Sequence, residues 1–314
     1  MTEPTMRAIR QVVLGGPEVL HEVEIPKPEL GVSQILVRVH AAGLNPTDWS
    51  HRAFPIFLGP PPFTLGWDVS GVVEATGFGV TLFKPGDEVF GMLPYPHGVG
   101  SHAEYVAGPA RAFAAKPENL DHVQAGALPL AALTAWQALN DTARLQAGQR
   151  VLIHAAAGGV GHLAVQIAKA RGAYVIGTAS ARHHDLVRGL GADELIDYNT
   201  TDFATAVRDA DMVLETVGGD YPMRTLRTLR PGGLLVALLP FPPEVREEAN
   251  KAGVSAQVML VEHDHGGMTA IADLVTAGKL SPVIAGIFPL ADAAKAHELG
   301  ETRHVAGKLV LTMV

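Results

Sequence analysis

The chain has 314 residues, of which 47% are hydrophobic and 18% charged, and it carries a formal net charge of −8. This composition is that of a folded globular protein, and the length corresponds to about two domains of the usual 100–200 residues. The excess of acidic residues excludes the basic surface that nucleic acids and anionic membranes attract. The absence of cysteine removes disulfides, thiolate nucleophiles and cysteine-ligated zinc.

The sequence also argues against export and membrane insertion. The N-terminal residues contain no apolar run of the about 7–15 residues that a secretory signal requires. The longest clean apolar stretch, residues 234–239, is far shorter than the roughly 18 residues of a membrane-spanning helix. We therefore expect a cytoplasmic protein with no membrane or nucleic-acid partner.

The first third of the chain has the period of β-strands. Short apolar runs, in which residues such as Ile35, Val37 and Val39 alternate with polar ones, are separated by turns rich in Gly and Pro. The runs that predict strands are residues 8–14, 34–41, 68–76, 88–93 and 102–107. This pattern predicts a β-rich, barrel-like domain. After Pro117 the period becomes helical, so a boundary is expected near residues 120–130.

From residue 149 short β-branched runs alternate with helical stretches. The predicted strands cover residues 150–154, 174–177, 194–196, 212–215, 233–239 and 256–261, with helical segments between them. Such alternation is typical of a doubly wound parallel sheet. The tail after residue 268 continues as helix, strand, helix, strand, and we expect part of it to return to the first domain.

A glycine-rich turn gives the first indication of chemistry. Residues 151–168 form a predicted strand, a tight turn and an apolar-faced helix. Against the G-x-G-x-x-G pattern of dinucleotide-binding proteins, Ala156 takes the first glycine position, while Gly158 and Gly161 fill the others. A helix N-terminus behind such a turn favours a pyrophosphate. The alternative is a turn that serves only close packing of strand and helix.

The end of the second predicted strand of this domain favours one dinucleotide. An NAD site usually has Asp or Glu about 20 residues after the turn, to bind the ribose hydroxyls. Here residues 174–184 contain no carboxylate, whereas Ser180 and Arg182 are able to donate to a 2′-phosphate. The segment therefore predicts NADP(H). The alternative for Arg182 is a solvated residue at a helix start.

Further motifs carry a family resemblance. They are Asn45–Asp48, Gly66–Gly71, Lys84–Gly91, Ala125–Trp136 and residues 155–161. In this order, over nearly the whole chain, they resemble the zinc-independent, zeta-crystallin-like quinone oxidoreductases of the medium-chain dehydrogenase/reductase superfamily. The resemblance implies an α/β protein with a GroES-like catalytic domain, residues 1–124 completed by residues 265–314. It also implies that a Rossmann domain that binds NADP, residues 125–264, is inserted between these two parts.

The zinc-dependent branch of that superfamily holds its catalytic metal with Cys, His and Cys. At the matching places this sequence has Asn45, Trp67 and Leu130, which are unable to replace those ligands as a set. We therefore expect no metal. The pairs His183-His184 and His263-x-His265 are interpreted as solvated histidines, because no third and fourth ligand accompanies them.

The resemblance also implies roles for individual residues. Asn45 and Thr134 are expected beside the nicotinamide as the catalytic pair. The residues of the glycine turn are expected at the pyrophosphate. The remaining expected cofactor-binding residues are Gly158, Gly159, Val160, Gly161, Ser180, Arg182, Tyr198, Leu239, Ile287, Phe288 and Lys308. For Asn45 the alternative is a turn-capping residue before Pro46. The sequence identifies no general acid.

The resulting hypothesis is an NADPH-dependent reductase of quinones or activated alkenes, in which the cofactor carries the hydride. An enoyl-thioester reductase or a pathway-specific ene-reductase would use the same residues and differ in the loop between Phe54 and Phe63. A catalytically idle NADPH-binding protein with a structural or regulatory role is the alternative of another class. Residues 256–261, at the expected edge of the inserted sheet, predict a homodimer.

Overall fold

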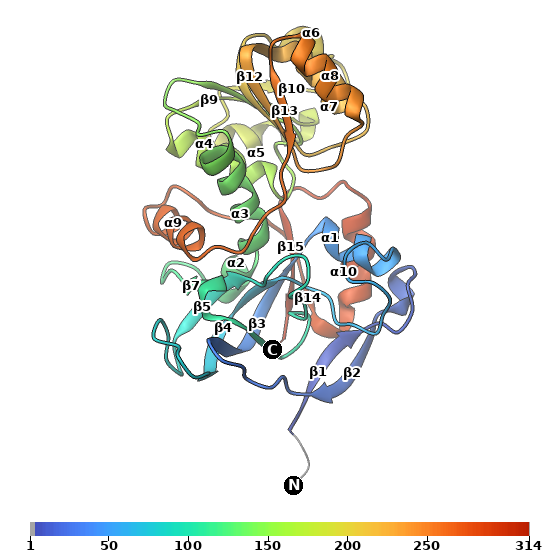
Figure 1. Cartoon of the computed structure of the whole chain (residues 1–314), viewed down its shortest axis with the longest axis vertical. Coiled ribbons are helices and arrows are strands. Elements are labelled where there is room, and N and C mark those ends of the chain that lie inside the picture. Colours follow the sequence, from blue (N-terminus) through green and yellow to red (C-terminus); the bar gives the residue numbers. More distant parts are fainter. Residues whose placement is uncertain (1–3, 314) are drawn as a thin grey trace. The chain divides into compact units, whose positions relative to one another are not determined.

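The computed structural model describes residues 4–313, and the chain folds as two compact units (Figure 1). The first unit consists of the chain up to Leu133 and the chain from Glu262 onward. The second unit consists of Thr134 to Val261. The chain therefore leaves the first unit and returns to it. The predicted combination of a β-rich domain with an inserted doubly wound domain is confirmed.

The first unit is built on a seven-stranded sheet of order β14-β15-β3-β4-β5-β7, with β6 also paired to β3. Its strands are β3 (Gln34–Leu44), β4 (Asp68–Thr76), β5 (Glu88–Met92), β6 (Tyr105–Pro109), β7 (Phe113–Ala115), β14 (Ile284–Pro289) and β15 (Lys308–Thr312). The alternation of Ile35, Val37 and Val39 on β3 buries all of them, as predicted. β15 pairs antiparallel with β3, so the tail completes this sheet.

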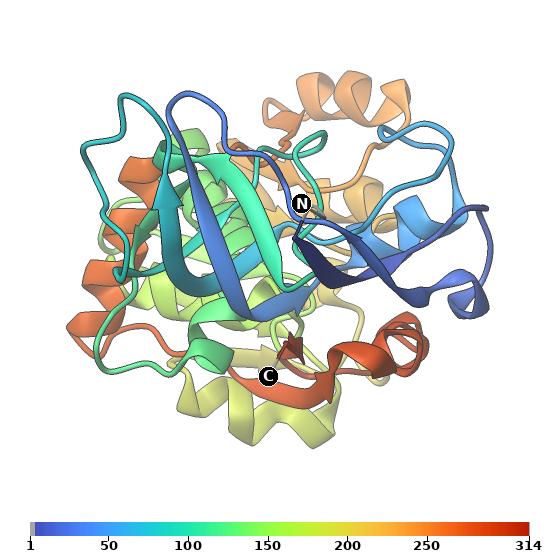
Figure 2. The ribbon, with the colours of Figure 1, turned by 90° about the horizontal axis from the view of Figure 1, so that it is seen from below.

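An N-terminal hairpin and several helices accompany that sheet. The hairpin consists of β1 (Thr5–Arg10) and β2 (His21–Pro26). The helices are α1 (Pro46–Ala53), α2 (His122–Gly126), α3 (Pro129–Trp136), α9 (His265–Thr276) and α10 (Ala293–Glu301). Figure 2 shows α10, in red, beside the dark blue hairpin, although they come from opposite ends of the sequence. The strand predicted over residues 8–14 ends at Arg10, and Val12 and Val13 are exposed in the connection that follows.

The second unit is a six-stranded parallel sheet of order β10-β9-β8-β11-β12-β13. Its strands are β8 (Arg150–Ile153), β9 (Tyr174–Thr178), β10 (Glu194–Ile196), β11 (Ala210–Glu215), β12 (Leu229–Ala237) and β13 (Ser255–Val258). The order reverses between β8 and β11, which is the point where doubly wound sheets bind their ligands. The predicted last strand, residues 256–261, is shorter than expected and forms the edge of this sheet.

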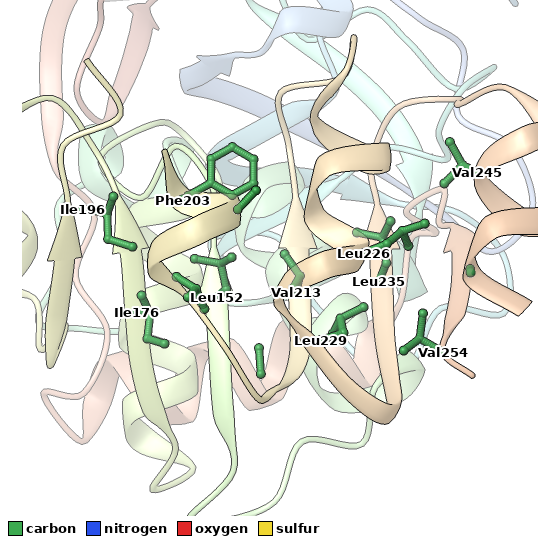
Figure 3. Close-up of a cluster of buried hydrophobic side chains, with 14 residues drawn as sticks. Leu152, Ile176, Ile196, Phe203, Val213, Leu226, Leu229, Leu235, Val245 and Val254 are labelled. Atoms are coloured by element: carbon green, nitrogen blue, oxygen red, sulfur yellow. The ribbon is translucent and has the colours of Figure 1, made fainter. Parts of the chain in front are cut away.

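Helices connect these parallel strands. They are α4 (Gly161–Ala170), α5 (His184–Gly189), α6 (Phe203–Ala206), α7 (Tyr221–Thr225) and α8 (Pro243–Lys251), with a π-helical segment at Gln137–Thr142. Short 3₁₀ turns occur at Pro17–Val19, Ala110–Ala112, Ala181–His183, Leu226–Thr228 and Leu290–Asp292. Figure 3 shows the apolar core on one face of the sheet, where Leu152, Val213 and Leu235 from adjacent strands pack with Phe203 and Val245. In residues 4–313 no helix is long and apolar enough to cross a membrane.

Candidate functional site

The glycine turn of the second unit lies between β8 and α4. Ala155 adopts a left-handed conformation with φ +48°, and the amide of Gly158 donates to the Ala155 carbonyl at 2.8 Å. A Cβ placed at Gly161 would lie 2.8 Å from the Ala156 Cα and still closer to the Ala155 carbonyl oxygen. Only glycine therefore permits α4 to begin so close to the turn. Close packing, the alternative interpretation of the turn, therefore accounts for the glycine at position 161.

Packing does not account for the rest of the turn. Within residues 4–313 the amides of Gly159, Val160 and Gly161 donate to no other group. They precede or open the ten-residue helix α4, whose dipole places partial positive charge at this end. Gly158, Gly159 and Val160 are only partly buried. The turn therefore presents unpaired donors and a positive dipole end, which is the arrangement that binds a phosphate.

A buried histidine that the sequence analysis did not single out lies directly before this turn. His154 follows β8 and is wholly buried, with Nδ1 3.2 Å from Thr178 Oγ1 and Nε2 3.0 Å from Thr225 Oγ1. Burial lowers the pKa of His154 to about 3, so the ring is neutral. Its ring packs edge-on against Phe203 and Tyr221. The signal in the sequence was a polar residue that directly follows an apolar strand.

The residues predicted to select NADP(H) follow the carboxyl ends of the neighbouring strands β9 and β10. Ser180 begins the 3₁₀ turn after β9, and its hydroxyl makes no capping bond there. Arg182 is exposed, and its Nε donates to His183 Nε2 at 3.0 Å. Tyr198, beyond β10, is 45% exposed. These side chains are therefore accessible to a ligand at this edge of the sheet.

The loop after β12 holds the next predicted residue. Leu239 is exposed, and a Cβ at Gly218 would lie 2.9 Å from its Cδ1. Glu215, at the end of β11, is buried, and its Oε1 accepts hydrogen bonds from the amides of Val217 and Gly218. Burial raises the pKa of this carboxyl group. Glu215 thus fixes the turn against which Leu239 packs, a role the sequence analysis did not anticipate.

In the first unit, Asn45 is held by its side chain. It precedes α1 and is buried; its Nδ2 donates to Asp68 Oδ2 at 2.9 Å, while its Oδ1 accepts from Lys308 Nζ at 2.5 Å. The start of the helix is instead closed by Asp48, whose Oδ2 accepts the Asn45 amide at 2.7 Å. The side chain of Asn45 is therefore not a simple turn cap. It is part of a buried polar network.

Lys308 and Asp68 complete that network. Lys308 Nζ donates to the Leu44 carbonyl at 2.8 Å and lies 3.4 Å from Asp68 Oδ2, and both side chains are buried. Asp68 Oδ1 also accepts from the Leu130 amide at 2.6 Å. Burial raises the pKa of Asp68, and the Lys308 charge opposes that rise. The ammonium group of Lys308 is thus directed at Asn45 and Asp68, which makes Lys308 a residue that positions Asn45.

The other predicted residues differ in their accessibility. Thr134 is buried on α3 and has a hydrogen-bonding or other polar partner. Ile287 is exposed on the edge strand β14, whereas its neighbour Phe288 is partly buried. Because successive strand residues face opposite sides of a sheet, these two point in opposite directions.

The three residues that the resemblance matches to the zinc positions of the metal-dependent branch are not available as a set of ligands. Trp67 is wholly buried and Leu130 nearly so, while the amide of Asn45 is already bonded on both its atoms. His265 is likewise occupied, since its Nδ1 lies 2.6 Å from the Phe113 carbonyl oxygen. Across the described residues no group of three His, Asp or Glu side chains is placed to hold a metal ion.

Comparison with known proteins shows which family has this architecture. An alcohol dehydrogenase GroES-like domain model matches residues 31–118, and a zinc-binding dehydrogenase model matches residues 190–311. The structure of the quinone oxidoreductase from Coxiella burnetii superimposes with a TM-score of 0.94 at 39% identity, covering 99% of this chain and 100% of that one. The chain belongs to the quinone oxidoreductase family of the medium-chain dehydrogenase/reductase superfamily.

Two further proteins are similar over nearly their full length. The 2-haloacrylate reductase of a Burkholderia species is 35% identical, covering 95% of this chain and 96% of that protein. The Escherichia coli quinone oxidoreductase, solved in complex with NADPH, has a TM-score of 0.87 at 28% identity, covering 98% of this chain and 100% of that one. The family recognised from the sequence motifs is therefore confirmed.

Proposed function

We propose that this protein is an NADPH-dependent reductase that delivers a hydride to a quinone or an α,β-unsaturated carbonyl compound without a metal ion. The observation that carries the proposal is the open donor set of the second unit. The unpaired amides of Gly159 and Val160 are accompanied by Ser180 and Arg182 at the ends of adjacent parallel strands. Donors of this kind fit the two phosphate positions of NADPH.

The residues that would hold the cofactor follow from this fit and from the family. Gly158, Gly159, Val160 and Gly161 would bind the pyrophosphate, and Ser180, Arg182 and Tyr198 the 2′-phosphate side. Leu239, Ile287 and Phe288 would supply apolar contacts for the nicotinamide, with Asn45 and Thr134 beside it. When bound, NADPH supplies the hydride, and the protein supplies orientation and electrostatics.

Asn45 has a defined part in this proposal. Lys308 and Asp68 fix both ends of its amide, so the side chain has a single orientation. Its Nδ2 carries a second N–H, and no described residue accepts it. Asn45 therefore offers an oriented donor without rearrangement, which is the property that makes a polar group effective in catalysis.

Metal independence is part of the proposal. Its support is the occupation of the family's zinc positions by Asn45, Trp67 and Leu130. Elemental analysis of the purified protein is expected to find no stoichiometric zinc. About one tightly bound zinc per chain, together with loss of activity on chelation, would contradict it.

The oligomeric state and the location of the protein belong to the same proposal. β13 is an edge strand of the parallel sheet, and an unpaired edge is usually covered or paired. We infer a homodimer that pairs at this edge. We also infer a cytoplasmic location, with which the absence of cysteine agrees.

A substrate panel tests the proposed activity. NADPH oxidation is followed with quinones, enones and enoyl thioesters, in the unsubstituted protein and in the variants Asn45→Ala and Asn199→Ala. Asn199 is exposed and, among residues 4–313, its side chain bonds only to Asp197, so its variant serves as the control. We expect the unsubstituted protein to turn over quinones or enones. We expect Asn45→Ala to lower the turnover rate and Asn199→Ala to leave it unchanged. A preference for enoyl thioesters would reassign the substrate, and NADPH binding without any turnover would indicate the idle binding protein.

A further inference from the structure

A chain of hydrogen bonds in the first unit lies beside Asn45 and has no part in the cofactor site proposed above. Thr47 Oγ1 is 3.0 Å from His51 Nδ1 and 3.1 Å from the Tyr95 hydroxyl. Thr47 is on the first turn of α1, His51 is on its last turn, and Tyr95 is on the loop after β5. The network therefore begins two residues after Asn45 and ends on a phenol.

The direction of each hydrogen bond follows from the atoms involved. His51 Nδ1 lies 2.8 Å from the Thr47 carbonyl oxygen, which accepts only, so Nδ1 carries the proton. The same N–H faces Thr47 Oγ1, which therefore accepts at that contact. Among the residues that the structure describes, the hydroxyl proton of Thr47 then has one acceptor, the Tyr95 oxygen. Tyr95 accepts from Thr47, and its own proton remains available to an outside acceptor.

Packing fixes the phenol in this orientation. The ring of Tyr95 lies 5.3 Å from that of the wholly buried Trp67, 6.3 Å from Phe57 and 6.4 Å from His51, each in an edge-to-face arrangement. Tyr95 is itself only partly buried. The ring is therefore held on several sides, while part of the side chain stays exposed.

Phe57, whose ring contacts Tyr95, belongs to an exposed apolar stretch of the chain. Phe54, Ile56 and Phe57 follow α1 and are 64%, 48% and 45% exposed. Exposed large apolar side chains that occur together mark a binding site more often than a random surface. A flat apolar molecule with a carbonyl oxygen would satisfy both features, since it covers the apolar side chains and accepts the free proton of Tyr95.

The geometry points to Tyr95 as the proton donor of the reduction, with Thr47 and His51 as the residues that position its hydroxyl. This inference rests on the proposed reductase function. The hydride forms a C–H bond at the β-carbon, and the π electrons move to the carbonyl oxygen. The Tyr95 O–H bond breaks as a new O–H bond forms on that oxygen, and the phenolate recovers a proton from water. The substrate gains two electrons and two hydrogens in total.

Within the part of the chain that the structure describes, the ionisable groups that face Tyr95 are His51 and Asp48, both on α1. Both are neutral near pH 7. Burial lowers the pKa of His51 and raises that of Asp48 to about 8. Burial also raises the pKa of Tyr95 above its ordinary value of 10.0. Tyr95 thus retains its proton at neutral pH, and the rate of reduction falls only when the pH rises into the alkaline range.

The primary test replaces the donor and keeps the ring. Tyr95→Phe is expected to lower kcat for enones by about 100-fold or more, the size of a general-acid contribution, and to leave NADPH binding unchanged. The alkaline fall of kcat is expected to disappear in this variant. Tyr105→Phe, on β6, is the matched control, because Tyr105 contacts Lys27 and lies outside the network.

A second pair of variants tests the positioning role. Thr47→Val removes the hydroxyl that orients Tyr95 and is expected to lower kcat about tenfold. Thr47→Ser keeps the hydroxyl and is expected to retain the kcat of the unsubstituted protein. Normal turnover of Tyr95→Phe, within twofold and with the alkaline fall intact, would overturn the inference and leave the reductase proposal standing. Absence of turnover in the unsubstituted protein would overturn both.

Discussion

Lys308 Nζ lies 2.5 Å from Asn45 Oδ1, although 263 residues separate them in the sequence. The contact joins the first residue of β15 to the residue that precedes α1. The returning tail therefore does more than complete the sheet, because it supplies the cation that fixes the candidate catalytic amide. Any change that displaces β15 is expected to disturb Asn45.

Replacement of Lys308 by Met is expected to destabilise the protein strongly. It leaves Asp68 as a buried carboxylate without its counter-charge, and breaking such a pair costs about 3–5 kcal/mol. Urea unfolding measures the effect. The control is Arg188→Met, which removes an exposed pair with Asp185 and is expected to change the free energy of unfolding by less than about 1 kcal/mol. Equal effects of both variants would contradict the network.

Asp48 is expected to make stability fall as the pH rises. Its pKa is about 8 in the folded protein and about 3.9 in an unfolded chain, so the folded state binds more protons between these values. The stabilisation is complete below about pH 4 and is lost as the pH rises through 8. Asp48→Asn is expected to reduce this decline, by up to about 1.4 kcal/mol per pH unit. Unfolding at pH 5, 6.5 and 8 provides the test, and an unchanged slope would show that Asp48 is ionised when folded.

Gly161→Val is expected to weaken the binding of both NADPH and NADH. The new side chain would collide with the backbone of Ala155 and Ala156 and displace the start of α4. Gly189→Val is the matched control, because nothing lies within 4 Å of a Cβ at that glycine. Calorimetric binding titrations distinguish the two. Unchanged affinities in Gly161→Val would mean that the turn does not bind the dinucleotide.

Arg182→Asp is expected to erase or invert the preference for NADPH. Hydrogen bonds to charged groups contribute roughly 1.5–3 kcal/mol each, and an exposed Arg182 realises less, so the preference of the unsubstituted protein is about tenfold or more. The control, Arg188→Asp, makes the same charge change further along on α5. Comparison of kcat/KM for NADPH and NADH measures the effect. Equal use of NADH by the unsubstituted protein would refute this assignment of Arg182.

The edge strand β13 provides a test of self-association. Val258 and Leu260 are 38% and 52% exposed at and just beyond the end of this strand. Leu260→Lys is expected to shift a dimer toward monomer, while Val12→Lys, at an exposed position of the first unit, is expected to leave it intact. Light scattering at micromolar concentration gives the mass. A single-chain mass for the unsubstituted protein would exclude the dimer.

The sequence predicted those features that local pattern determines. The glycine turn was recognisable because the residues that form it, from Ala155 to Gly161, are contiguous, and the period of two in β3 directly reports which side chains are buried. The alternating strands and helices of the second unit likewise define its class of fold.

The sequence was less informative wherever contacts join distant segments. Nothing in the pattern around Lys308 indicates that its ammonium reaches Asn45, and the predicted direct role at the cofactor stays a prediction. The network from His51 to Tyr95 depends on the placement of a loop that pattern does not determine. α3 continues from Pro129 to Trp136 through the division between the units at Thr134, so helical periodicity gives no sign of that division.

Isotope transfer tests the central claim most directly. An enone is reduced in ordinary water with NADPH that carries deuterium at the transferable position of its nicotinamide, and the product is analysed by mass spectrometry and NMR. We predict one deuterium at the β-carbon, an α-hydrogen derived from solvent, and the same result after dialysis against a chelator. A product without deuterium, or transfer that requires added metal, would contradict a direct, metal-independent hydride reduction.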